Sequence, residues 1–169
     1  LTHATLRWPQ VFISNNGPVG LLWEQDEITL KERSWNVTPS ASTSSSPPGS
    51  GLNIGAYLNL GESYLDATAE GDLNLSFLQQ ILPETLPSVE GAVGLNIEVL
   101  GTFDSLEPYG SIEVHSPIVL EVGGLHQTLT LASGAIELDG TTLSVPRSRS
   151  LRGRLDEGEV TIHGEALIK

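Results

Sequence analysis

A five-residue pattern recurs along this chain: a glycine, a free position, an aliphatic residue, another free position and a second aliphatic residue. Its last five copies begin 19 to 24 residues apart, which is the length of two medium strands with their turns. A repeat of this length is typical of architectures in which each unit buries its apolar face against its neighbours. We expect each glycine to start or turn a strand and the two aliphatics to lie side by side on one apolar surface. The six copies begin at Gly17, Gly71, Gly91, Gly110, Gly134 and Gly158.

Aliphatic residues occupy every second position over most of the chain, as in Leu52 to Leu60 and Val93 to Val99. This period of two indicates strands with one apolar and one wet face. Tight turns at Gly123-Gly124 and Asp139-Gly140 favour an antiparallel meander over βαβ units. The chain is therefore predicted to be all-β. Glutamates are expected on the wet face, at Glu113, Glu121, Glu137 and Glu159.

Two stretches depart from the alternation. The segment 39–51 is rich in Ser, Pro and Gly, which predicts a flexible insert between N-terminal strands in 1–38 and a main body in 52–169. Ser76 is a suitable N-cap, and the apolar spacing after it predicts a short helix over 76–82, ended by Pro83. The N-terminal strands are expected to belong to the same sheet as the main body.

Charge and composition exclude several classes of protein. The formal net charge is -13, so binding to nucleic acid or to an anionic membrane surface is unfavourable. The chain has no Cys, which excludes disulfides and thiolate metal sites. No apolar run has the length of a membrane span, and no signal peptide opens the sequence. Because the chain starts at Leu1 in what reads as a strand, we expect a piece of a longer protein.

The residue types that carry catalysis form no recognisable site. The histidines at 3, 115, 126 and 163 lack metal-ligand spacing. The acidic pairs Asp26-Glu27 and Asp156-Glu157 read as solvated turn carboxylates, since neither lies in an apolar setting that would shift a pKa. Neither a nucleophile elbow nor a phosphate-binding loop occurs. We therefore expect a protein that is not an enzyme and uses no metal or cofactor.

Half of the basic residues lie close together, at Arg147, Arg149, Arg152 and Arg154. They could contact an anionic headgroup or an acidic partner. They could equally be the charges with which an exposed edge strand resists aggregation.

A many-stranded aliphatic sheet with almost no helix to cover it has few ways to bury its apolar side. It can close as a sandwich or barrel, or curl into a trough that receives something apolar. Aromatic residues make up only 5% of the chain, which disfavours a carbohydrate-binding sandwich. We expect an antiparallel meander curled into a taco-like half-barrel. Its groove would be lined by alternating aliphatics, namely Leu52, Ile54, Leu58, Leu60, Leu73, Leu75, Val93, Leu95, Ile97, Val99, Ile112, Val114, Leu129, Leu131, Ile136, Leu138, Leu143, Val145, Val160 and Ile162.

The order of these motifs resembles the conserved C-terminal region of the TamB family. The resemblance rests on seven segments: ISNNGPV at 13–19, GDLNL at 71–75, SFLQQILP at 76–83, VEGAVGLNIEVLGTF at 89–103, PYGSIEV at 108–114, LTLASGAIELDG at 129–140 and GEVTIHG at 158–164. It covers most of the chain except 39–51, and it depends on the order of degenerate patterns.

TamB proteins are AsmA-like, bridge-type proteins of diderm bacteria, and the resemblance implies a corresponding role. It implies a segment in the periplasm of a longer protein that is anchored in the inner membrane. It also implies an apolar groove that conducts phospholipid or other acyl chains, and an Omp85-family outer-membrane barrel, TamA, as partner of the full-length protein. The alternatives are a scaffold that templates client barrel strands by β-augmentation and a closed β-sandwich module.

Overall fold

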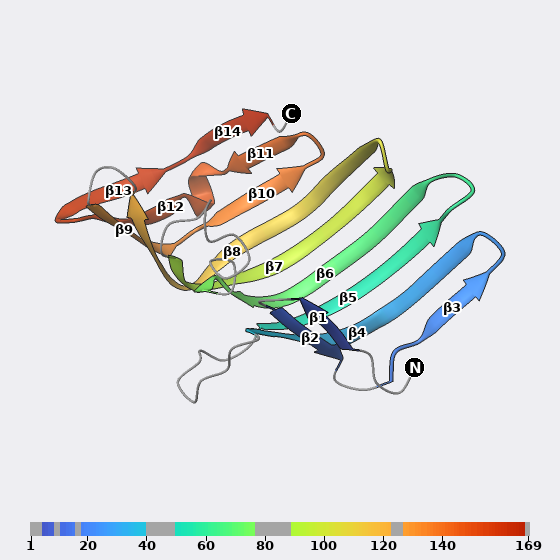
Figure 1. Cartoon of the computed structure of the whole chain (residues 1–169). Helices are drawn as coiled ribbons and strands as arrows, with labels where there is room; N and C mark the ends of the chain where they lie inside the picture. The colour runs from blue at the N-terminus through green and yellow to red at the C-terminus, as the bar shows by residue number, and fades with distance from the viewer. Residues whose placement is uncertain are drawn as a thin grey trace.

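The protein folds as a single antiparallel β-sheet. The computed structural model describes residues 5–8, 11–15, 18–39, 50–76, 89–122 and 127–167. All of the strands in these ranges belong to one 14-stranded sheet (Figure 1). The described residues therefore contain no second sheet that could face the first as in a sandwich. The all-β prediction is confirmed.

The strands are joined in sequence order and vary widely in length. The bounds are β1 Thr5–Trp8, β2 Val11–Asn15, β3 Leu21–Glu24, β4 Glu27–Pro39, β5 Ser50–Asn59, β6 Tyr64–Asn74, β7 Val89–Thr102, β8 Ser105–Val122, β9 Gln127–Ser133, β10 Ala135–Asp139, β11 Thr142–Val145, β12 Leu151–Leu155, β13 Gly158–Ile162 and β14 Gly164–Leu167, with a 3-10 turn, η1, at Arg147–Arg149.

Several short strands are pieces of longer, interrupted ones. The long strand β8 pairs with β9 through its C-terminal part and with β10 through its N-terminal part. In the same way, β12 continues the ladder from β9 while β11 continues it from β10. At the other side of the sheet, β2 and β3 both pair with β4. Every ladder between the described strands is antiparallel, which confirms the meander.

The sheet is open and uncurled, in contrast to the expected half-barrel (Figure 1). Among the residues that the structure describes, β1 pairs only with β2, and β13 and β14 each pair with one inner strand, so these two sides of the sheet form no ladder with each other. Bulges and kinks are what bend a sheet toward closure. The ladders of β5 with β6 and of β6 with β7 run without a register shift, whereas the ladder of β7 with β8 shifts near Ala92.

The repeated glycines have a different structural role from the expected one. Gly71, Gly91 and Gly110 lie inside strands rather than at their starts, and all have positive φ. Gly110 illustrates the reason: its φ is 118°, and a Cβ there would collide with the backbone of Asn96 on β7. Only glycine fits this conformation and this close approach. Gly134 and Gly158 follow the expectation, because one separates β9 from β10 and the other begins β13.

The expected boundaries are partly corrected. The N-terminal strands do join the same sheet, because β4 pairs with β5. The insert is shorter than 39–51, since Pro39 ends β4 and Ser50 already begins β5; residues 40–49 lie outside the described residues. Of the expected helix only Ser76 is described, and it is helical. The expected Gly123-Gly124 turn also lies outside the described residues, whereas Asp139-Gly140 joins β10 to β11 as predicted.

Candidate functional site: the apolar face of the sheet

One face of the sheet is built almost entirely of aliphatic and small residues. Residues directly opposite each other in an antiparallel ladder project to the same side. Starting from Leu52 on β5, the registers lead to Gly71 on β6, Leu95 on β7, Ile112 on β8 and Ile136 on β10. The parallel row from Ile54 runs through Ala69, Ile97, Gly110 and Leu138 to Leu143. We call this side the apolar face and the opposite side the polar face.

The strand registers bring nearly all of the predicted lining residues together on the apolar face. Those in β5 to β8 lie in the two rows just described or, two residues further along the same strands, in neighbouring rows of the same face. Leu129 and Leu131 on β9 project to this face because they pair with Leu120 and Ile118 on β8. Val160 and Ile162 on β13 face the same way through their pairs with Gly153 and Leu151. Leu60 and Leu75 lie just beyond the ends of β5 and β6, so no ladder register places them.

The apolar face has a buried part and an open part. The buried cluster consists of Val89, Val93, Ile118, Leu131, Val145 and Leu151, each at most 8% exposed. It lies toward the end of the sheet where β6 leads to β7 and β8 leads to β9. At the opposite end tight turns join β5 to β6 and β7 to β8, and there Leu106 on the apolar face is 43% exposed, while Leu60 and Phe103 in the turns are 46% and 51% exposed. We call these two parts the loop end and the tight-turn end.

The sequence patterns missed several members of the apolar face. Leu65, Ala67 and Ala69 on β6 project to it opposite Leu58, Ala56 and Ile54, and Leu106 on β8 pairs with Gly101. Alanine and glycine carry little hydrophobic signal, which hid the alternation of β6. Leu151 is buried in the core cluster, yet its strand is so rich in arginine that it reads as a charged edge.

The polar face carries most of the negative charge in the central strands. Asp66, Glu70 and Asp72 on β6 alternate with the apolar-face residues, and Glu98 on β7 lies opposite Tyr109 on β8. The four glutamates expected on the wet face also project to this side, because they alternate along their strands with the aliphatic residues of the apolar face. In the ladders, Glu113 lies opposite Gly94, Glu121 opposite Thr128, Glu137 opposite Ser144 and Glu159 opposite Arg154.

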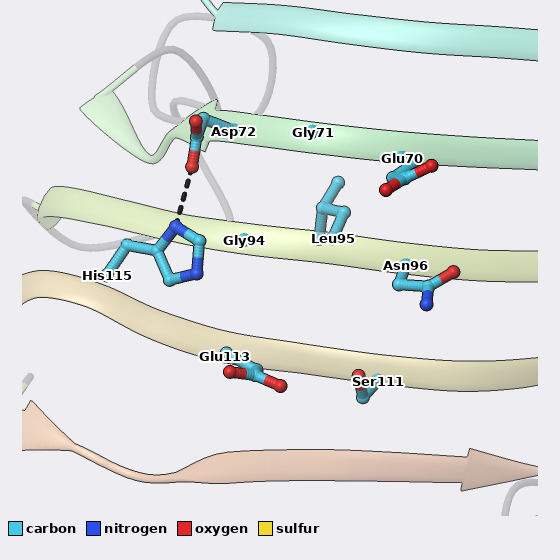
Figure 2. Close-up of a pocket in the computed structure, with 9 residues that line it drawn as sticks. All are labelled: Glu70, Gly71, Asp72, Gly94, Leu95, Asn96, Ser111, Glu113 and His115. Atoms are coloured by element: carbon cyan, nitrogen blue, oxygen red, sulfur yellow. Dashed lines mark hydrogen bonds and ion pairs between the residues drawn. The ribbon is translucent and has the colours of Figure 1, made fainter.

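A shallow pocket on the polar face is organised by one histidine (Figure 2). His115 on β8 reaches across Gly94 on β7 to Asp72 on β6, with 2.6 Å between its Nδ1 and the carboxylate. A Cβ on residue 94 would collide with the imidazole, so Gly94 leaves the space through which the ring crosses. The two side chains are 50% and 70% exposed. An ion pair this exposed contributes little to stability or to binding.

Two other polar contacts define the electrostatics of this face. The hydroxyl of Tyr109 donates a hydrogen bond to Glu107, 2.7 Å away, and this bond raises the pKa of the phenol above its ordinary value. The guanidinium of Arg149 contacts the carboxylates of Glu113 and Glu137. Within the described ranges, no group of three or more acidic, histidine or cysteine side chains is arranged to hold a metal ion.

Comparison with known proteins yields no match: no family model, no curated protein and no solved structure is detectably similar to this chain. The helices of the described ranges include none that is long and apolar enough to cross a membrane.

Proposed function

We propose that this chain is a periplasmic segment of a bridge-like protein that conducts phospholipid along the apolar face of its sheet. The observation that carries the proposal is a single-layer sheet with one face apolar across its strands and partly exposed at the tight-turn end. Contiguous exposed apolar surfaces mark sites for apolar ligands or partners. An acyl chain would gain about 0.8 kcal/mol for each CH₂ that it buries, without the directional bonds that would hold it at one position.

The cellular location and the partner that we propose are inferred from the sequence motifs that resemble those of the TamB family. The full-length protein would be anchored in the inner membrane and would support outer-membrane biogenesis together with an Omp85-family barrel. The many carboxylates of the polar face favour contact with water over contact with acyl chains. Acyl chains would thus contact the apolar face while the polar face stays in water.

The proposal is tested by native mass spectrometry of the protein with phospholipid. Ile97 lies on the apolar face of β7, and Leu100 lies on the polar face of the same strand, opposite Asp66. We expect Ile97→Asp to lose most bound lipid and Leu100→Asp to retain it, with circular dichroism confirming that both remain folded. Absence of lipid from the unsubstituted protein, or equal loss in both variants, would refute the proposal.

A second candidate function is an assembly scaffold for outer-membrane barrels. It is favoured by β3, which within the described ranges pairs with β4 alone and exposes Leu21, Leu22 and Trp23. Edge strands with free backbone groups accept an added strand. A photoreactive residue at Leu22 would then cross-link an extended barrel-strand peptide, whereas one at Leu100 in the middle of the sheet would not.

A further inference from the structure

The sheet contains a seam where two consecutive strand interruptions lie side by side. Gly134, with φ at 127°, separates β9 from β10, and η1 separates β11 from β12. The two interruptions are in contact, because a Cβ on Gly134 would collide with the backbone of Ser150 and Leu151. The ladder of β9 with β12 also shifts register at Arg152, as in a β-bulge. Bulges commonly redirect side chains at functional sites.

A hollow opens at this seam, and its walls carry hydrogen-bond donors. It measures about 690 Å³, part of which is open to solvent. Ser133, Ser148, Arg149 and Arg152 line it, together with the carboxylate of Glu113. The hydroxyl of Ser150, also in the wall, is committed to the carbonyl oxygen of Arg147 at 2.8 Å. Ser133 and Ser148 have no hydrogen-bond partner among the described residues, so their hydroxyls are available to a ligand.

The two arginines of the hollow differ in their partners. Arg149 contacts Glu113 and Glu137, so its charge is compensated and its position is held. Arg152 forms no ion pair with any residue that the structure describes, and it is exposed. Its guanidinium therefore presents an uncompensated fork of donors. The carboxylate of Glu113 in the same wall is in contact with Arg149 rather than with Arg152.

We propose that this seam binds a phosphoryl group. Arg152 supplies a bidentate contact, for which the planar guanidinium is suited. The hydroxyls of Ser133 and Ser148 add donors from β9 and from η1, so the donors come from more than one element of the wall. A tetrahedral phosphoryl group, with three or more acceptor oxygens, fits donors from several sides better than a flat carboxylate does. The site is on the polar face and is independent of the proposed lipid binding on the apolar face.

The test measures binding of inorganic phosphate to the whole chain by isothermal titration calorimetry. Arg152→Gln is compared with Arg154→Gln, which removes the same charge from the same face of β12 but does not line the hollow. We expect Arg152→Gln to weaken binding about tenfold or more, as for loss of a charge-assisted hydrogen bond. Arg154→Gln should change it less than threefold. Circular dichroism checks that both variants are folded.

A second pair of measurements identifies the source of the phosphoryl group. Phosphatidylcholine vesicles with and without phosphatidic acid are offered to the same variants. Vesicle binding that requires phosphatidic acid and Arg152 assigns the site to a lipid headgroup, and phosphate binding without vesicle binding assigns it to a soluble phosphoryl compound. Equal effects of the two arginine substitutions, or no phosphate binding at all, would overturn the proposal. Ile97→Asp should leave phosphate binding intact, which separates this site from the apolar face.

Discussion

The loop end and the tight-turn end of the apolar face share one sequence pattern but differ in burial. Val93 and Val99 are both aliphatic, both on β7 and both on the apolar face. Val93 is 5% exposed and belongs to the core cluster. Val99 is only half-buried and lies near the exposed Leu106. Alternation along the strand therefore determines the face to which a residue projects. Packing against that face determines whether the residue contributes to the core or remains accessible to a ligand.

A charge at the loop end should have the largest effect on stability. We expect Val93→Asp to lower the free energy of unfolding by about 3–5 kcal/mol, because it places an unpaired charge in the buried cluster. Val99→Asp, on the same strand and face, should cost about 1 kcal/mol because water reaches it. Urea denaturation of both variants measures the difference. Equal losses would mean that the two ends do not differ as described.

The glycines inside the strands should be the next most sensitive positions. Gly110→Ala combines a strained backbone with a collision against β7, so we expect it to cost about 1–3 kcal/mol. Gly51→Ala is the matched control, because a Cβ there meets nothing within 4 Å. Thermal unfolding followed by circular dichroism compares the two. A tolerated Gly110→Ala would show that β7 and β8 can separate at this point.

The polar face should contribute little to stability. We expect a double-mutant cycle on Asp72→Asn and His115→Gln to give a coupling energy below about 1 kcal/mol, since both groups are largely exposed. Urea denaturation at neutral pH and low salt would measure it. A larger coupling would make the His115 crossing a structural element comparable with the core cluster.

The smallest expected effect is a change in titration at Tyr109. Its hydrogen bond to Glu107 favours the neutral phenol, so the folded-state pKa is raised above the unfolded value. The bond therefore favours the folded state at neutral pH and is lost as pH rises through the folded-state pKa. Alkaline absorbance titration should show Glu107→Gln returning the pKa toward its ordinary value. An unchanged curve would indicate that the bond is not formed in solution.

Features of the fold that depend on residues close together in sequence could be predicted, whereas features that depend on distant residues could not. Alternation such as Leu52 to Leu58 predicts both the strand and the side that it turns to the apolar face. The position of Gly110 inside β8 could not be predicted, because its need for glycine comes from the neighbouring backbone of Asn96. The partners of Arg149 lie 12 and 36 residues away in sequence, so only the folded sheet reveals them. The openness of the sheet likewise depends on ladder registers rather than on composition.

The central claim, that acyl chains bind the apolar face, is tested most directly by photo-cross-linking along β7. A photoreactive amino acid is placed singly at each position from Leu95 to Leu100 and irradiated with labelled phospholipid. Our account predicts cross-links at Leu95, Ile97 and Val99 but not at Asn96, Glu98 or Leu100, because alternate residues project to opposite faces. Cross-links at all six positions, at none, or at the polar-face set alone would contradict it.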